Sequence, residues 1–139
     1  MATSFLLYNF FMIGIDIEDI SRFKDKDDSF LNRVFTPLEL EYCLSKKNPA
    51  PHLAARFCAK EAVFKALSSF GIQGVLITQI EIYNDSNSCP RVRFLGRGTQ
   101  YKVHISLSHE KEKAIAFAML DIEDFKRAAY HPCAQGDEG

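Results

Sequence analysis

The sequence lacks several signatures that would assign a class of protein at once. Its 139 residues carry a formal net charge of −1, so no overall field draws the chain to nucleic acid or to a membrane surface. The four cysteines form no Cys-x-x-Cys pair, which disfavours zinc and disulfide sites and favours free thiols in a reducing compartment. The sequence also contains no P-loop, nucleophile elbow or glycine-rich dinucleotide-binding turn. The enzyme classes that depend on these motifs are therefore disfavoured.

The chain also has no recognisable targeting segment. The apolar stretch at residues 5–15 lacks a basic start and a small-residue cleavage site. It is shorter than the roughly 20 residues that a membrane-spanning helix needs. An organellar presequence would be rich in arginine, whereas the first basic residue is Arg22. We therefore expect a cytoplasmic protein.

The order of the predicted elements indicates a single α+β domain. Neither internal repeats nor an internal linker interrupts it, and we expect the domain to cover residues 1–121, followed by a partly disordered extension at 122–139. The predicted elements are a strand at 8–17, a short helix at 18–23, a helical turn at 30–35, helices at 36–45 and 53–67, and strands at 77–83, 91–95, 102–107 and 114–120. This order predicts an antiparallel sheet packed around a long central helix.

The predicted central helix carries one unexpected charge. Residues 53–67 contain no Gly or Pro, and helical periodicity places Phe57, Glu61 and Phe64 in one stripe, with small residues opposite. Such a helix is apolar nearly all round, which predicts burial. An unpaired carboxylate in an apolar environment is costly, so Glu61 needs a compensating group.

Two carboxylates and two lysines are candidates for chemistry. Asp16 ends the first predicted strand, and together with Glu61 it would suit Mg²⁺, which takes one or two carboxylates plus water and phosphate. The structural alternatives are that Asp16 caps the following helix and that Glu61 pairs with Lys65 at i,i+4. Lys60 and Lys65 are either solvated side chains or neutralise phosphate. The spacing alone leaves these alternatives open.

His109 is a further candidate because it closes an alternating strand. A histidine at a strand end is more often structural than a ligand. A ligand role for His109 is therefore the less favoured alternative from the pattern alone.

Four motifs taken together resemble a known family. They are Gly14-Ile15-Asp16-Ile17, Arg33-Val34-Phe35-Thr36 with Glu39, Arg56 to Ala62 with Lys65, and Ser106-Leu107-Ser108-His109. Their order and spacing over about residues 12–120 resemble the holo-acyl-carrier-protein synthase branch of the 4′-phosphopantetheinyl transferase superfamily. The resemblance implies that the chain transfers 4′-phosphopantetheine from coenzyme A to a serine of an apo acyl carrier protein and releases 3′,5′-ADP. It also implies a place in fatty acid biosynthesis, although the sequence leaves the pathway of the carrier open.

The resemblance assigns roles to individual residues. Asp16 and Glu61 would hold Mg²⁺, with Glu61 or a water near it as the base and Lys65 stabilising phosphate. Arg56, Lys65, Ser108 and His109 match positions that contact coenzyme A. Arg22 and Lys24 would dock the acidic carrier protein.

The resemblance also implies a homotrimer whose active sites lie between subunits. In such a trimer His109 and Arg56 would serve the metal site of a neighbouring chain.

Two other functions remain open at this point. The first is a non-catalytic module of the same fold that binds coenzyme A or a carrier protein. The second is a Mg²⁺-dependent phosphohydrolase, which is disfavoured because no third carboxylate lies in a matching motif.

Overall fold

The computed structural model describes residues 11–98 and 100–122. The elements are β1 (Phe11–Asp19), the 3-10 helix η1 (Ile20–Phe23), α1 (Asp28–Val34), α2 (Pro37–Leu44), α3 (Pro49–Ser69), the 3-10 helix η2 (Ile77–Gln79), β2 (Ile80–Asn84), β3 (Pro90–Phe94), β4 (Lys102–His109) and β5 (Lys113–Asp121). The predicted α+β class and the long central helix are confirmed. The start of the predicted first strand, at 8–10, and the predicted extension beyond residue 122 lie outside the described residues.

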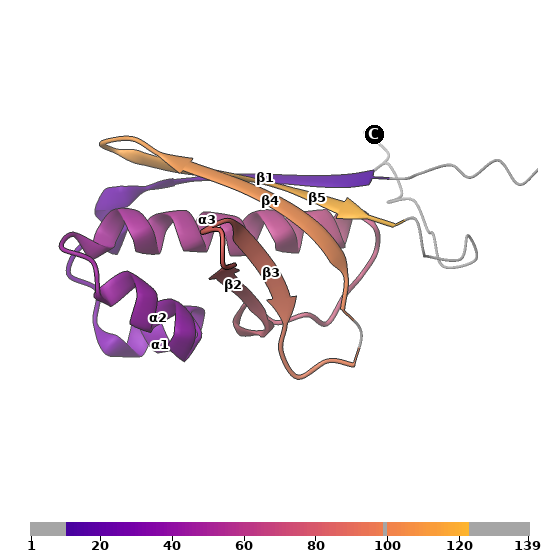
Figure 1. Ribbon diagram of the computed structural model, residues 1–139, viewed down its shortest axis with the longest axis horizontal. Helices are drawn as coiled ribbons and strands as arrows, with labels where there is room; N and C mark the ends of the chain where they lie inside the picture. Colours follow the sequence, from indigo (N-terminus) through magenta and orange to yellow (C-terminus); the bar gives the residue numbers. More distant parts are fainter. Residues whose placement is uncertain (1–10, 99, 123–139) are drawn as a thin grey trace, which may run out of the picture.

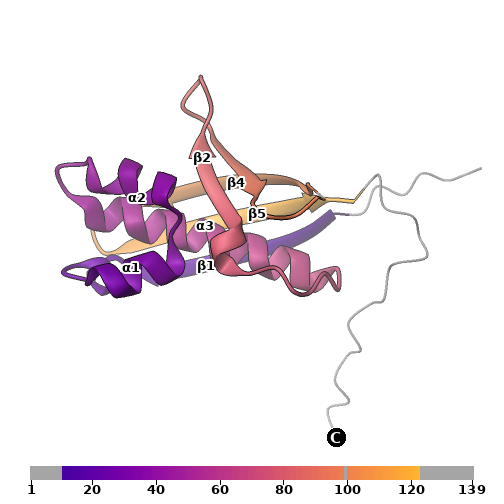
Figure 2. The same ribbon diagram turned by 90° about the horizontal axis from the view of Figure 1, so that it is seen from below.

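Helix α3 is the centre of the fold, with a different layer on each side (Figure 1). One layer is an antiparallel sheet with the strand order β1-β5-β4. On the other side lie α1, α2 and the hairpin formed by β2 and β3, whose tip projects from the body (Figure 2). The predicted strands therefore form two sheets around one helix.

Helix α3 is longer than predicted because its first turn contains prolines. It begins at Pro49, inside a segment expected to be a loop, and runs for 21 residues. Proline is tolerated at the start of a helix, where the missing N–H would have no intrahelical partner. Counting Pro as a loop residue therefore placed the predicted start at Leu53, one turn too late.

A glycine allows β1 to lie directly on α3. A Cβ atom on Gly14 would be 1.9 Å from the carbonyl oxygen of Ala62 and 2.8 Å from the amide nitrogen of Ala66. Real atoms cannot approach so closely, so only glycine permits this contact between strand and helix. The alanine side of α3 is accordingly buried against the three-stranded sheet, as expected.

The predicted aromatic stripe of α3 is only partly buried. Phe57 is buried, whereas Glu61 is half-buried and Phe64 is exposed. The expectation that α3 is buried all round is therefore wrong for this side, which lies beside the edge strand β1 rather than beneath the sheet.

The outer face of the three-stranded sheet is apolar and exposed. We call this surface the apolar sheet face; it consists of Ile13, Ile15, Ile17, Ile115 and Phe117. The three isoleucines of β1 are 58–60% exposed, and Ile15 and Ile17 pair directly with Phe117 and Ile115 of β5. Contiguous apolar surface of this kind is typical of an interaction site. Separately, none of the described helices is both long enough and apolar enough to cross a membrane.

Candidate active site

Asp16 lies beside α3 in the interior of a strand. Strand β1 continues to Asp19, two residues past its predicted end at Ile17, and the side chain of Asp16 points towards α3. Helix η1 begins only at Ile20, and its N-cap residue, Asp19, makes no side-chain cap bond. The alternative that Asp16 caps the next helix is therefore wrong.

Lys65 pairs with Asp16. Its ammonium group donates to Asp16 Oδ1 at 3.0 Å and to the carbonyl oxygen of Ile15 at 2.9 Å. Burial raises the pKa of Glu61, and the positive charge of Lys65 offsets only part of this rise. Lys65 thus forms its ion pair with Asp16 of the strand rather than with the helical glutamate that the i,i+4 spacing indicated.

Three carboxylates lie close enough to act on one another, and we call Asp16, Glu18 and Glu61 the acidic cluster. Burial raises the pKa of Glu61, and the charges of Asp16 and Glu18 raise it further. Burial likewise raises the pKa of the neighbouring Cys58 to about 12, with the same two charges contributing. Negative charge therefore accumulates between β1 and α3.

Glu18 is the member of the acidic cluster that sequence reasoning missed. Its signal was the alternation of the strand, because Asp16 and Glu18 are two residues apart and lie on the same face. Arg22 donates to Glu18 Oε2 at 2.9 Å and offsets part of its charge. The third carboxylate that the sequence did not place in a motif is thus supplied by the fold.

The acidic cluster fits Mg²⁺. Asp16 Oδ2 is buried and has no hydrogen-bond partner among the described residues. Within the same residues, no three side chains of His, Cys, Asp or Glu form a complete metal site. An incomplete set suits Mg²⁺, which needs only one or two protein carboxylates and takes its other ligands from water and substrate phosphate. Asp16 and Glu61 are the residues that could hold the ion.

A group of basic and aromatic side chains lies on another side of α3. We call it the basic cluster; it consists of Tyr42, Lys46, His52, Arg56 and His109. The guanidinium of Arg56 lies 4.1 Å from the ring centre of Tyr42, and the Lys46 ammonium 4.5 Å from it. The ring centre of His52 is 6.0 Å from that of Tyr42 and 6.0 Å from that of His109. The cluster can therefore attract an anion with several cations at once.

Arg56 and His52 show that the positive charges of this cluster are incompletely compensated. Arg56 is 4% exposed, and its Nε has no hydrogen-bond partner in residues 11–98 and 100–122. Burial lowers the pKa of His52, and the charges of His109, Lys46 and Arg56 lower it further. An anion bound here would relieve the repulsion among these groups.

A cavity of about 410 Å³ adjoins the basic cluster. Its lining comes from α2, α3, β2 and β3 and includes Tyr42, Arg56, Tyr83 and Arg93. Two aromatic rings and two guanidinium groups provide stacking surfaces and positive charge, although Glu41 adds one carboxylate to the lining. The cavity thus suits a planar ring that carries phosphate.

The structure unites some of the predicted ligand-binding residues and separates others. Arg56 and His109 belong to the same cluster, as the prediction of a shared ligand requires. Ser108 and His109 are consecutive in β4, so their side chains point to opposite faces, and Ser108 pairs with Ile115 on the apolar sheet face. Ser108 therefore lies apart from the basic cluster of its own chain.

Sequence reasoning also missed Tyr42, Lys46 and His52. His52 and Arg56 are four residues apart on α3, which places them on one helical face and was the available signal. Tyr42 lies in the last turn of α2, and Lys46 follows two residues after the helix ends at Leu44. The approach of these residues to one another and to His109 was not visible in the sequence.

Lys60 does not belong to either cluster. It is completely buried and donates to Glu39 at 2.5 Å. The prediction of a solvated or phosphate-binding Lys60 is therefore wrong, because α3 turns this side chain towards α2 and β2.

The predicted docking residues lie at the surface of η1. Arg22 is exposed, and its guanidinium lies 5.1 Å from the ring centre of Phe57 while it pairs with Glu18. Lys24 follows η1 and is also exposed. Both side chains are accessible to a partner, and Arg22 lies beside Glu18 of the acidic cluster.

Comparison with known proteins identifies the family. The family model for the 4′-phosphopantetheinyl transferase superfamily matches residues 12–118. This chain belongs to that superfamily. A holo-[acyl-carrier-protein] synthase from Protochlamydia amoebophila is 47% identical over 115 residues, which cover 77% of this chain and 94% of the relative. The synthase from Thermodesulfovibrio yellowstonii is 44% identical over 112 residues, covering 78% and 96%.

Solved structures of this superfamily have the same fold. The holo-(acyl-carrier-protein) synthase from Bacillus anthracis, crystallised in complex with coenzyme A (3′,5′-ADP), matches with a TM-score of 0.67 and 33% identity, over 79% of this chain and 95% of that one. The Mycobacterium tuberculosis acyl carrier protein synthase matches with a TM-score of 0.62 and 36% identity, over 78% and 95%. The resemblance inferred from the four motifs is thus confirmed.

Proposed function

We propose that this protein is a holo-[acyl-carrier-protein] synthase. It transfers the 4′-phosphopantetheine group of coenzyme A to a serine hydroxyl of an apo acyl carrier protein, with 3′,5′-ADP as the leaving group. The serine oxygen forms a bond to the β-phosphorus of coenzyme A. The bond between this phosphorus and the bridging oxygen of the departing 3′,5′-ADP breaks. Relatives named for this activity are 38–47% identical to the chain.

The observation that carries the proposal is the arrangement of Asp16, Glu61 and Lys65. In it, a strand aspartate with one unpartnered buried oxygen faces a helical glutamate. We propose that both hold Mg²⁺, which supplies charge neutralisation at the diphosphate. Lys65 orients Asp16 through Oδ1 and lies ready to stabilise a phosphate oxygen. Glu61 would also accept the proton of the serine, directly or through a water.

The basic cluster and its cavity would receive the nucleotide end of coenzyme A. Arg56, Lys46 and His109 provide charge for its 3′-phosphate. Tyr42 and Tyr83 line the cavity and can stack on the adenine. This assignment extends the predicted coenzyme A contacts of Arg56 and His109 to residues that the sequence did not single out.

The positions of the two clusters support an active site shared between subunits. Arg56 and Glu61 are five residues apart on α3, which separates them by about 140° around the helix and about 7.5 Å along it. The body of the helix and the sheet lie between them. A second copy that covers the apolar sheet face could bring its own basic cluster to the acidic cluster of the first chain.

The assembly that we propose is the homotrimer. The apolar sheet face is the surface available to it, since its isoleucines and Phe117 remain exposed in a single chain. Ser108 on the same surface would then contact coenzyme A at the boundary between copies. Arg22 and Lys24 would receive the acidic carrier protein, in the cytoplasm and as part of fatty acid biosynthesis.

The alternative is a module that binds coenzyme A or carrier protein without catalysis. The acidic cluster argues against it, because a binding module gains nothing from crowded carboxylates whose charge is costly. Calorimetry separates the two: a module should bind coenzyme A equally well with and without Mg²⁺.

The deciding experiment is mass spectrometry of an apo carrier protein incubated with this protein, coenzyme A and Mg²⁺. A gain of about 340 Da, the mass of the phosphopantetheine group, is expected if the serine is the nucleophile of the phosphoryl transfer. Omission of Mg²⁺ with a chelator is the control. An unmodified carrier protein, or breakdown of coenzyme A without an acceptor, would overturn the proposal.

A further inference from the structure

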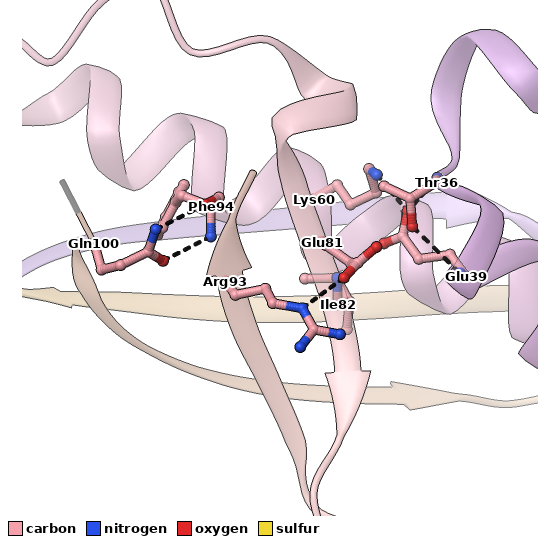
Figure 3. Close-up of polar contacts among 8 residues, drawn as sticks. All are labelled: Thr36, Glu39, Lys60, Glu81, Ile82, Arg93, Phe94 and Gln100. Carbon is pink, nitrogen blue, oxygen red and sulfur yellow. Dashed lines mark hydrogen bonds and ion pairs between the residues drawn. The ribbon is translucent and has the colours of Figure 1, made fainter. Parts of the chain in front are cut away.

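A single buried carboxylate joins three elements on the side of α3 opposite the sheet (Figure 3). Glu39 is fully buried, and its Oε1 accepts hydrogen bonds from Lys60 Nζ at 2.5 Å and from the amide of Thr36 at 2.9 Å. Its Oε2 accepts from the amide of Ile82 at 2.9 Å. One side chain therefore connects the N-cap of α2, the middle of α3 and strand β2.

The same three elements line the cavity beside the basic cluster. Tyr42 comes from α2, Arg56 from α3, and Ile82 and Tyr83 from β2. Ile82 both lines the cavity and donates its amide to Glu39. The relative positions of these lining residues thus depend on the bonds made by Glu39.

A second ion pair continues the connection to β3. Arg93 donates to Glu81 Oε1 at 2.6 Å (Figure 3). Its guanidinium also lies 4.4 Å from the ring centre of Tyr83. Glu81 is next to Ile82 in β2, and its charge also acts on Lys60. Arg93 and Tyr83, which face the cavity, are therefore held by the strand that Glu39 fixes.

We propose that Glu39 and Lys60 are positioning residues that hold the cavity in the shape required by the nucleotide end of coenzyme A. This inference rests on the proposed function. Neither side chain is exposed, so neither touches the ligand. They act through Tyr42, Arg56 and Tyr83, whose backbones they fix relative to one another.

A role in positioning explains why these two side chains are charged. A buried ion pair usually contributes little net stability compared with apolar residues of the same size, because both charges lose hydration. Its directional bonds do, however, fix one arrangement of the elements, whereas apolar contacts allow small shifts. A binding site that must align phosphate and ring contacts is sensitive to such shifts.

The test compares affinity with stability in the full-length protein. We would measure the Kd of 3′,5′-ADP by calorimetry, the KM for coenzyme A, kcat, and the unfolding temperature. The main variant is the charge-neutral pair Glu39→Gln with Lys60→Met, which removes the ion pair without leaving one charge buried alone. Glu39→Asp is the second variant, because it keeps the charge but is one methylene too short to make all three contacts.

We expect Kd and KM to rise by about tenfold in both variants while kcat at saturating coenzyme A changes by less than about threefold, since the acidic cluster is untouched. The double variant should unfold within a few degrees of the unmodified protein. Leu67→Ala, at a buried position of α3 outside the cavity lining, is the matched control: it should lower the unfolding temperature and leave Kd unchanged.

The outcomes separate the two proposals. A Kd within about twofold of the unmodified protein in either folded variant would overturn the positioning role, because a tenfold loss corresponds to a clear displacement of ligand contacts. A rise in Kd in Leu67→Ala as large as that in the Glu39 variants would also overturn the positioning role, since any loss of stability would then weaken binding. If the unmodified protein itself fails to bind 3′,5′-ADP, the proposed function is overturned, and this inference with it.

Discussion

The acidic and basic clusters lie on different sides of one helix and are assembled in different ways. The acidic cluster joins β1 to α3, which are far apart in the sequence and meet because Gly14 has no side chain. The basic cluster is built mainly from the pair His52 and Arg56 on α3 and from Tyr42 and Lys46 at and just after the end of α2. Each cluster keeps one buried polar atom, Asp16 Oδ2 or Arg56 Nε, without a hydrogen-bond partner within the described part of the chain.

This comparison shows that each cluster is electrostatically incomplete. Burial raises the pKa values of Glu61 and Glu18, and neighbouring carboxylates raise them further, which a cation would relieve. Burial lowers the pKa of His52, and the neighbouring basic groups lower it further, which an anion would relieve. In the function that we propose, a magnesium ion on a substrate phosphate would offset the negative charge of the acidic cluster, and another phosphate of the same substrate would offset the positive charge of the basic cluster.

The largest effect should come from neutralising the acidic cluster. We expect Asp16→Asn or Glu61→Gln to reduce transfer on the order of 10³-fold, because the transition-state charge loses its stabilisation, while the fold persists. Phosphopantetheine transfer to apo carrier protein measures the activity, and circular dichroism measures the fold. Glu112→Gln, at an exposed carboxylate of the β4–β5 turn, is the control and should be fully active. Full activity of Asp16→Asn would remove Asp16 from the metal site.

A charged substitution on the apolar sheet face should prevent two copies from associating. If the active site is shared, this separates the acidic cluster of one copy from the basic cluster of the other. We expect Phe117→Lys to yield a smaller species in light scattering and to reduce transfer on the order of 100-fold, because coenzyme A loses part of its site. Leu76→Lys, at an exposed leucine outside that surface, should change neither. A monomer with full activity would contradict the shared site.

Mixing two impaired variants tests the shared site more directly. In a shared site, Glu61→Gln supplies an intact basic cluster and Arg56→Ala supplies an intact acidic cluster. At a coenzyme A concentration too low to saturate Arg56→Ala, we expect the mixture, after exchange of subunits, to have more transfer activity than the two variants measured separately. If both clusters of one chain serve one substrate, mixing will give no gain in activity.

Changing the basic cluster should affect binding more than chemistry. We expect Arg56→Lys to raise the Kd of coenzyme A by about tenfold, because lysine keeps the charge but loses the planar group that lies against Tyr42. Calorimetry checks the affinity. Arg91→Lys, on the exposed side of β3 and paired with Asp85, provides the control with unchanged affinity. A tenfold loss of kcat with unchanged Kd would place Arg56 in the chemical step instead.

The smallest predicted effects are opposite pH dependences of stability. The folded pKa of Glu61 is raised above its usual 4.5, so metal-free folded protein binds more protons than the unfolded chain, and stability falls as pH rises from about 4.5. The folded pKa of His52 is lowered from 6.5, so stability falls as pH drops below about 6.5. Thermal unfolding across pH measures both effects.

The matched variants for this prediction are Glu61→Gln and His52→Gln. Each should flatten only its own part of the pH profile, and added Mg²⁺ should offset only the dependence that Glu61 causes. A profile that neither variant changes would contradict the electrostatic account of the clusters.

Much of the candidate site was predictable from the sequence because it depends on local chemistry. The central helix follows from a stretch without glycine or proline, and the cap of α2 follows from Thr36 and Glu39, whose reciprocal bonds are present. The four motifs indicated the superfamily, and with it the importance of Asp16, Glu61 and Lys65. These conclusions need only the identities and spacing of residues.

The tertiary structure decided which partner each charged residue has. Lys65 bonds to Asp16 rather than acting only within its helix, and Lys60 is buried against Glu39 rather than solvated. Both outcomes depend on how α3 is rotated between its two layers, which is set by contacts with residues far away in the chain. Sequence periodicity gives the angle between two residues of a helix, but only packing determines what lies opposite each of them.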